Sequence, residues 1–201
     1  AQDGVVVTVD EFGNGTATDN NSNLPNAGTD EIGTDTFIGA NYLRGSNYDD
    51  TLDASSNTNA SVGFRFRASG GDDTIIGGAG IDSIEHSDSG SGISVDLTLG
   101  SNQVINDGKS HPGGAFGTDT LTSIENVTGS DFDDLIIGDG GNNQLSGRAG
   151  NDDLQGGGGA DTLIGDNGGN SGGYAGGNDR LTGGAGADTL TGGGNADTFV
   201  F

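Results

Sequence analysis

A single apolar residue recurs every nine positions between residues 129 and 200, and the residues between are glycine-rich and polar. The members of this apolar column are Ile136, Leu145, Leu154, Leu163, Leu181, Leu190 and Phe199, and only Gly172 interrupts it. A period of nine fits neither the 3.6-residue period of a helix nor the two-residue alternation of a long strand. The three residues centred on each apolar position predict a very short strand, with the central side chain on one face and its neighbours on the other. The six residues before it predict a turn, because glycine permits positive φ angles.

These eight consecutive nonapeptides predict a solenoid. One three-residue strand buries almost no apolar surface alone, so the copies must stack, and a fixed short period is the signature of that architecture. We therefore predict an all-β fold, a parallel β-roll or β-solenoid with two turns per coil. Equivalent residues on one edge then stand two repeats apart.

Position six of each nonapeptide carries an acidic or amide side chain. The residues in this column are Asp134, Asn143, Asp152, Asp161, Asn170, Asp179, Asp188 and Asp197. Stacked turns place these side chains, and the carbonyl groups of the glycine-rich loops, in columns along the edges of the solenoid. Such hard oxygen ligands suit Ca2+, which accepts six to eight oxygens in flexible geometry.

Counting alternate turns divides the acidic column into two edges. We expect Asp134, Asp152, Asn170 and Asp188 on one edge, and Asn143, Asp161, Asp179 and Asp197 on the other. Neighbours on an edge share an ion, so the strongest sites are predicted for the pairs with two carboxylates, which are Asp134 with Asp152, Asp161 with Asp179, and Asp179 with Asp197. The turn at Asn170 lacks its apolar residue at Gly172, which makes it the predicted weak point of the roll.

The N-terminal half is a less regular version of the same design. Residues 4–10 and 62–66 predict strands, and degenerate repeats at 45–53, 68–76 and 77–85 contribute Asp50, Asp73 and Asp82 as candidate ligands. Same-edge turns are two repeats apart, so Asp73 and Asp82 are expected on opposite edges.

An internal duplication defines the organisation of the chain. Residues 33–52 align without gaps to residues 117–136 at an offset of 84, and the strand-like segment 4–10 recurs at 92–97. We expect two units, 1–90 and 91–201, in one continuous solenoid that becomes regular from residue 129. Each unit contains a polar insertion, at 13–30 and at 100–117, and we expect a solvent-exposed loop at the second.

The nonapeptide G-G-x-G-x-D-x-U-x, in which U is a large apolar residue, resembles the repeats of the RTX (repeats-in-toxin) calcium-binding β-roll family. The best copies here are GGGGADTLI at 156–164 and GGAGADTLT at 183–191. The resemblance implies a right-handed parallel roll with Ca2+ bridging successive turns on both edges. It also implies a bacterial protein exported by type I secretion.

Composition adds a reason for the metal. The chain has 201 residues, 43 of them glycine, with only 29% hydrophobic residues and a net charge of -24. So few apolar side chains favour disorder, and so much negative charge expands the chain unless cations neutralise it. We therefore predict folding on Ca2+ binding outside the cell. The acidic balance disfavours nucleic acid and anionic membranes, and no apolar run reaches the length of a membrane span.

Other motifs carry less weight. Asp19, Asn21, Asn23 and Asp30 have the spacing of an EF-hand loop, but Leu24 stands where that loop needs glycine. Gly108-Lys109-Ser110 ends like a phosphate-binding loop without its first glycine, and residues 169–173 match G-x-S-x-G inside the repeat register. His86 and His111 lack a zinc-binding partner motif and are expected on the surface.

We therefore predict no enzyme activity and no catalytic residue within this chain. The preferred hypothesis is a calcium-dependent structural or adhesive module of a large secreted or cell-surface bacterial protein. The alternative is a non-catalytic accessory module of an exported enzyme, such as a protease, a lipase or a polysaccharide-modifying enzyme.

Since the chain begins at Ala1 without Met and ends in an apolar strand, we interpret it as a fragment of a longer protein. Besides calcium, the candidate partners are a second copy of the chain, cell surfaces and polysaccharides. Regular outward ranks of Thr or Asn, as ice binding requires, are not present.

Overall fold

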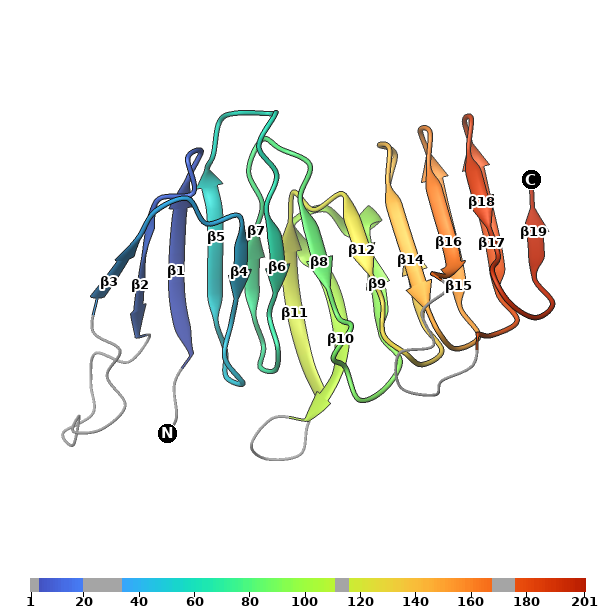
Figure 1. Ribbon diagram of the computed structural model, residues 1–201, viewed down its shortest axis with the longest axis horizontal. Helices are drawn as coiled ribbons and strands as arrows, with labels where there is room; N and C mark the ends of the chain where they lie inside the picture. The colour runs from blue at the N-terminus through green and yellow to red at the C-terminus, as the bar shows by residue number, and fades with distance from the viewer. Residues whose placement is uncertain (1–3, 20–33, 111–115, 168–175) are drawn as a thin grey trace.

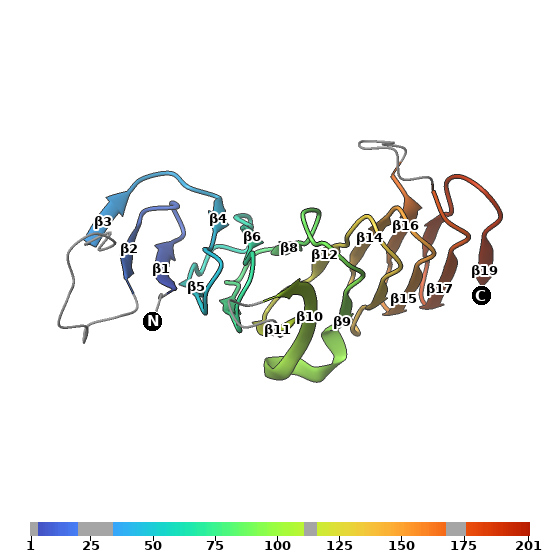
Figure 2. The same cartoon turned by 90° about the horizontal axis from the view of Figure 1, so that it is seen from below.

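The computed structural model describes residues 4–19, 34–110, 116–167 and 176–201, and its strands form two sheets that face each other along an elongated roll (Figures 1 and 2). Successive strands of the C-terminal half alternate between the two sheets, so each coil contributes one strand to each sheet. Within the described residues we name these the long sheet, of twelve strands, and the short sheet, of seven. The all-β parallel roll predicted from the nine-residue period is confirmed.

The long sheet contains strands from the whole chain. From the N-terminal end of the roll, its order is β3 (Thr34–Phe37), β2 (Gly15–Asp19), β1 (Val5–Asp10), β5 (Thr51–Ser56), β7 (Thr74–Ile76), β11 (Phe116–Thr122), β10 (Gln103–Ser110), β9 (Ser94–Asp96), β13 (Leu135–Ile137), β15 (Asp153–Gly158), β17 (Arg180–Ala185) and β19 (Thr198–Val200). The short sheet runs beside it in the order β4 (Tyr42–Arg44), β6 (Arg65–Arg67), β8 (Ser83–Glu85), β12 (Asn126–Thr128), β14 (Gln144–Arg148), β16 (Thr162–Asp166) and β18 (Thr189–Thr191).

The core lies between the sheets and consists of about one apolar side chain per strand. In the long sheet the column Leu52, Ile75, Leu121, Ile136, Leu154 and Leu181 is fully buried, and in the short sheet Phe66, Ile84, Leu145 and Leu163 are. Residues on either side of these positions are exposed or half-buried, as in β13, where only Ile136 is buried; the exception is Ser146 beside Leu145, which is buried. The prediction that the apolar residue points inward from a minimal strand is therefore confirmed for Ile136, Leu145, Leu154, Leu163 and Leu181, whereas Leu190 is partly buried and Phe199 is 42% exposed. Strand β1 agrees with the prediction for 4–10, whereas β6 is shorter than the predicted 62–66.

The duplicated segments have the same structure. In each unit three antiparallel strands, β1–β2–β3 and β9–β10–β11, lie side by side in the long sheet, and a short-sheet strand follows, β4 or β12. Both sheets continue from the first unit into the second. The boundary at residue 90 stays a prediction.

The loop predicted for residues 100–117 is wrong in its described part. Residues 103–110 and 116–122 form β10 and β11, and a 3-10 helix, η1 (Leu97–Asn102), leads into them. This polar segment forms strands because it pairs antiparallel inside the sheet, with Gln103 opposite Leu121 and Ile105 opposite Asp119, so its backbone groups are satisfied. Part of the insertion at 13–30 is likewise strand β2. Asn21, Asn23 and Asp30, whose EF-hand-like spacing carried little weight, lie outside the described residues. None of the described segments forms a helix long and apolar enough to cross a membrane.

Candidate calcium sites

One column of acidic residues follows the edge at which the chain turns into the long sheet, and we call it the first edge. The backbone N–H of Asp134 donates to Asp152 Oδ1 at 2.8 Å, that of Asp152 to Asp179 Oδ1 at 2.9 Å, and that of Asp179 to Asp197 Oδ1 at 3.0 Å. Each carboxylate is therefore fixed by the coil before it. In Asp152 and Asp179 the oxygen Oδ1 accepts this hydrogen bond, and the oxygen Oδ2 is left for a further partner.

A second column follows the turns that lead into the short sheet, which we call the second edge. The N–H of Asn143 donates to Asp161 Oδ1 at 2.9 Å, and that of Asp161 to Asp188 Oδ1 at 3.0 Å. The amide of Asn143 also donates from Nδ2 to the carbonyl of Glu125, at 2.7 Å. The side chain at position six therefore binds the backbone of the coil before it, with the acids accepting from an N–H and Asn143 donating to a carbonyl.

The predicted assignment of residues to edges is wrong after residue 166. Asp179 lies beside Asp152, 27 residues away, and not beside Asp161. Asp188 lies beside Asp161, not on the edge of Asp134 and Asp152. The strand pairing agrees with these contacts, because β15 pairs directly with β17 in the long sheet. Asn170 and Gly172, the predicted weak point, lie outside the described residues.

The cause is an insertion of one nonapeptide length within a single turn. Asp166 pairs with Arg148, and the N–H of Asn178 donates to Asn151 Oδ1 at 2.9 Å, so residues on both sides of 167–175 occupy positions of the same turn. An insertion of nine residues leaves every later residue at the same position of the nine-residue pattern. Counting nonapeptides along the sequence therefore does not detect it. The interruption of the apolar column at Gly172 was the one signal of it in the sequence.

Glycine at position one is required by the acid that follows. A Cβ on Gly147 would collide with Asp152 Oδ2, and one on Gly156 would collide with Asp161 Oδ2. At Gly156 the carbonyl oxygen of Gly183, on the next coil, would also lie only 2.6 Å from that Cβ. At Gly156 a carboxylate oxygen and a carbonyl oxygen of the next coil therefore converge over the glycine, and hard oxygen ligands in this arrangement fit Ca2+.

Three of these carboxylate oxygens have no hydrogen-bond partner. They are the Oδ2 atoms of Asp152, Asp161 and Asp179, whose residues are at most 2% exposed. A buried carboxylate oxygen without a partner is costly, and buried charges are normally paired or bound to a metal. In the described residues no three acidic or histidine side chains form a metal-binding group on their own. A bound ion would therefore need backbone carbonyls to complete its coordination.

Burial also raises the pKa values of these acids. Burial, opposed by hydrogen bonds and reinforced by neighbouring carboxylates, raises the pKa of Asp152 to about 9 and those of Asp134 and Asp179 to about 6. For the same main reason the pKa values of Asp161 and Asp82 lie above their ordinary value. Such sites strongly disfavour bare negative charge, and a bound divalent cation would reverse that preference.

The N-terminal candidates join the same two columns. On the first edge the N–H of Asp50 donates to Asp73 Oδ1 at 2.6 Å, and that of Asp73 to Asp119 Oδ1 at 2.9 Å. On the second edge the N–H of Asp82 donates to a carboxylate oxygen of Glu125 at 2.8 Å. Burial is the largest effect that raises the pKa values of Asp50 and Glu125. Asp73 and Asp82 lie on opposite edges, as expected.

Two column members were missed by reasoning from the sequence, Asp119 and Glu125. Glu125 directly precedes β12, whose central residue is the buried Val127. Asp119 lies within β11 and directly precedes Thr120, Leu121 and Thr122, which pair with β7 and keep the apolar residue in the middle as in the regular repeats. The glycine-rich residues normally found before the acid are missing, so a search for the full nonapeptide does not detect them. His86 was predicted on the surface, and this is wrong: it directly follows β8 and is 2% exposed. His111 lies outside the described residues.

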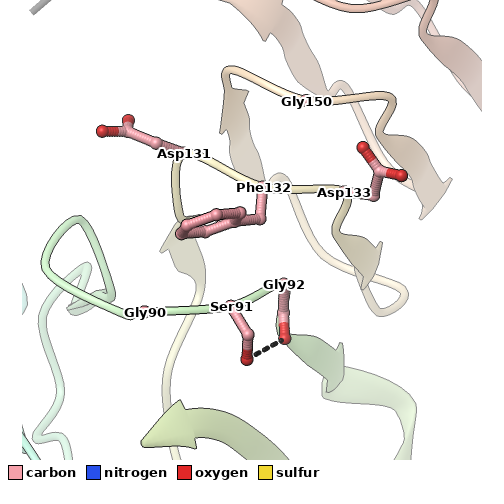
Figure 3. A pocket seen from close by; sticks show the side chains of 7 residues that line it. All are labelled: Gly90, Ser91, Gly92, Asp131, Phe132, Asp133 and Gly150. Carbon is pink, nitrogen blue, oxygen red and sulfur yellow. Dashed lines mark hydrogen bonds between the residues drawn. The ribbon is translucent and has the colours of Figure 1, made fainter. Parts of the chain in front are cut away.

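A pocket of about 560 Å³ opens on the first edge between residues 90–92 and 131–133 (Figure 3). It lies where the column of acids restarts, because Ile93 stands in the place of an acid and donates its N–H to Asp134 Oδ1 at 2.8 Å. The carboxylates on its rim have partners, since Asp131 pairs with Arg148 at 2.7 Å and Asp133 accepts from Asn151. The pocket is therefore a gap between unlike turns rather than a further member of the calcium series.

Two facing parallel sheets, glycine-rich turns and columns of buried acids define a calcium-binding β-roll. The model of the RTX calcium-binding nonapeptide repeat family matches residues 33–59, 65–85, 119–154, 128–163, 137–171 and 175–201. These matches cover well over half of the chain, which therefore belongs to the RTX family. As RTX repeats, its turns bind several Ca2+ ions. No curated protein matches the chain.

Proposed function

We propose that Ca2+ is bound between neighbouring turns on both edges of the roll, and that binding drives folding of the chain. The observation that carries the proposal is the set of buried Oδ2 atoms without partners at Asp152, Asp161 and Asp179, each beside a glycine. The pairs proposed to share an ion are Asp134–Asp152, Asp152–Asp179, Asp179–Asp197, Asn143–Asp161, Asp161–Asp188, Asp50–Asp73, Asp73–Asp119 and Asp82–Glu125.

Calcium is expected to act mainly on folding. Without it, the folded state holds poorly solvated carboxylates close together, in a chain with a net charge of -24 and a core only one residue deep per strand. A ligand that binds only the folded state adds its binding free energy to the stability of that state. Extracellular calcium modules are tuned to roughly 0.1–1 mM, so the chain would be unfolded at cytosolic Ca2+ and folded outside the cell.

The module would then serve as a structural or adhesive part of a secreted or cell-surface protein. Folding only at extracellular Ca2+ suits export as an unfolded chain, and an elongated roll suits a spacer or a contact surface (Figure 1). Retention of the chain on bacterial surfaces or on polysaccharide in millimolar Ca2+, and its release by chelator, would support the adhesive part. If a variant that does not bind Ca2+ is retained as well as the wild type, the adhesive role is contradicted.

Folding and binding are tested together by titrating the whole chain with Ca2+ under circular dichroism, with Asp152→Asn and Asp153→Asn as a matched pair. Both substitutions remove one negative charge, but Asp153 is partly exposed and pairs with Arg180, whereas Asp152 is buried. The β-signal should appear with Ca2+ in the wild type and in Asp153→Asn, and require more Ca2+ in Asp152→Asn. A full β-signal in excess chelator would refute calcium-driven folding.

A further inference from the structure

The outward face of the short sheet carries almost no acidic side chain. This face runs along one side of the roll, away from the long sheet (Figure 2). Residues beside the central apolar position of a strand point away from the core. In the seven described strands of the short sheet only Glu85 is acidic at such a position, although the chain has 30 acidic residues. The long sheet has Asp53, Asp96 and Asp153 at the corresponding positions.

Three of the six basic residues of the chain lie together on this face. They are Arg44 of β4 and Arg65 and Arg67 of β6, and Tyr42 of β4 lies beside them. Tyr42 pairs with Arg65 across the two strands, and Arg44 pairs with Arg67. The guanidinium carbon of Arg65 lies 5.9 Å from the centre of the Tyr42 ring, which is a cation–π contact. We call these four residues the arginine patch.

Two of the three arginines have donors available for a partner. Arg67 is used within the fold, because its Nη2 donates to Glu85 Oε1 at 2.7 Å and to Ser87 Oγ at 2.6 Å. The side chain of Arg44 is 60% exposed, and its Nη2 lies 3.9 Å from the nearest oxygen of Asp88, beyond hydrogen-bond distance. Arg65 is exposed and forms no ion pair with a described residue.

The stability of the fold does not account for the arginine patch. Arg44 stands directly opposite Arg67 on the neighbouring strand, and like charges in that position are destabilising. An anion between the arginines would remove the repulsion. In a chain with a net charge of -24, a local excess of positive charge on one sheet face therefore fits an anionic partner.

We propose that the arginine patch binds carboxylate groups of an acidic polysaccharide that lies along the short sheet. The planar guanidinium groups of Arg44 and Arg65 match a carboxylate with two parallel hydrogen bonds. The Tyr42 ring, 41% exposed, offers an apolar surface to the C–H groups of a sugar ring. Beyond the patch the face continues with hydroxyl and amide side chains such as Gln144 and Thr162, which exchange hydrogen bonds with sugar hydroxyls. This inference names a partner for the proposed adhesive role and rests on that role.

The same face is less suited to a peptide or to nucleic acid. Peptides are held mainly by apolar or aromatic anchors, and within the described strands Tyr42 and Ile164 are the only such side chains beside the central positions of the short sheet. Nucleic acid needs many basic contacts along its phosphates, and the patch has two arginines to offer. A polymer with separated carboxylates and many hydroxyls matches this combination.

Binding is tested by calorimetric titration of the whole chain, in millimolar Ca2+, with short oligosaccharides of galacturonate, mannuronate and hyaluronate. We expect at least one of them to bind, and dextran oligosaccharides of the same length, which carry no charge, not to bind. The affinity should fall as salt is added, since the contacts are exposed. Absence of binding to all three acidic ligands, or equal binding of dextran, overturns the proposal. Equal or tighter binding of duplex DNA overturns the assignment to polysaccharide.

Arg65→Gln and Arg180→Gln are the matched pair for this titration. Each removes one positive charge from an exposed arginine, but Arg180 lies on the long sheet and pairs with Asp153 at 3.0 Å. Arg65→Gln should weaken binding about tenfold or more, and Arg180→Gln should bind as the wild type does. Arg65→Lys keeps the charge without the planar group and should fall between them. Equal losses in Arg65→Gln and Arg180→Gln would show that only the overall charge matters, and would overturn the site.

The aromatic contact is tested with Tyr42→Phe and Tyr42→Ala. Phenylalanine keeps the ring and should bind as the wild type does, whereas alanine should bind several-fold more weakly. Equal affinities of the two variants would overturn the role of the ring. Sedimentation velocity in Ca2+ examines a second copy as the occupant of the face. Oligomers of the wild type that Arg65→Gln abolishes would assign the patch to self-association and overturn the polysaccharide proposal.

Circular dichroism of the same samples separates this proposal from the proposed function. A Ca2+-induced β-signal without polysaccharide binding refutes the arginine patch as a binding site and leaves calcium-driven folding intact. A β-signal that does not depend on Ca2+ refutes calcium-driven folding, and the titrations are then carried out on that folded chain. The two failures are therefore distinguishable.

Discussion

Asp152 and Asp179 are direct neighbours on the first edge although 27 residues separate them, with the N–H of Asp152 donating to Asp179 Oδ1 at 2.9 Å. Their counterparts Asp134 and Asp152 make the same contact across 18 residues. The roll therefore accepts an additional nine residues within one turn while the carboxylates stay in their column. Asp166 stabilises the resumed turn, since its carboxylate accepts from the N–H of Gly177 at 3.3 Å and of Gly194 at 3.0 Å.

Deletion of residues 167–175 should leave the roll and its calcium binding intact. The remaining residues on both sides already occupy the positions of an ordinary turn, and a shorter loop lowers the entropy cost of closure by a few tenths to about 1 kcal/mol. The calcium midpoint in circular dichroism should be equal to or lower than that of the wild type.

Deletion of residues 156–164 is the matched control, because it also removes nine residues. It removes half a coil, so every later strand would move to the opposite sheet and Asp179 would no longer follow Asp152. We expect a substantial loss of β-signal or of bound Ca2+. Equal behaviour of the two deletions would contradict the register described above.

The features that the sequence predicts correctly are those that depend only on residues within one nonapeptide. The strand at Ile136, the turn glycine at Gly147 and the acid at Asp152 each follow from a pattern within nine residues. The neighbour of Asp152 depends on the path of the chain through residues 167–175, and a nonapeptide count cannot distinguish a coil from an insertion of the same length. Asp119 and Glu125 were missed for the opposite reason, since they keep the strand pattern and lose the glycines.

Glycine at position one should be replaceable only where no carboxylate lies above it. In Gly147→Ala the new Cβ collides with Asp152 Oδ2, whereas at Gly140, an ordinary turn glycine, a Cβ meets nothing within 4 Å. We expect Gly147→Ala to lose roughly 1–3 kcal/mol of stability in Ca2+, as overpacked sites do, and Gly140→Ala to change it by less than about 1 kcal/mol. Chemical denaturation of both variants in saturating Ca2+ measures the difference.

Substitution of an acidic residue should weaken calcium binding in proportion to the number of proposed sites that the residue shares. Asp161 lies between Asn143 and Asp188 on the second edge, whereas Asp197 ends the first edge in the described residues. Asp161→Asn should therefore weaken two proposed sites and Asp197→Asn one. Loss of a charged ligand costs about 1–3 kcal/mol per site, or roughly 5- to 150-fold in affinity. Calorimetric titration of the two variants gives the comparison, and a larger effect at Asp197 would argue against ions shared between turns.

Acid and calcium should each stabilise the roll, but they compete for the same buried carboxylates. In the metal-free fold burial raises the pKa of Asp134 and Asp179 to about 6 and that of Asp152 to about 9, above their ordinary value of 3.8. A carboxyl whose pKa is higher in the folded than in the unfolded state stabilises the fold fully below the unfolded pKa, and this stabilisation is lost as the pH rises through the folded pKa. The metal-free roll should therefore be more stable near pH 4 than at pH 7, with the loss running from about pH 4 to about pH 6 for Asp134 and Asp179 and on to about pH 9 for Asp152.

Bound calcium reverses this dependence, because it requires the ionised carboxylates and competes with protons for them. Calcium affinity should fall as the pH decreases from 8 to 5, and binding at pH 7 should release protons, which calorimetry in buffers of different ionisation enthalpy counts. Asp152→Asn removes the group with the highest pKa and should release fewer protons, whereas Asp153→Asn should release as many as the wild type. A calcium affinity that does not change between pH 8 and pH 5 would show that these buried acids are not the ligands.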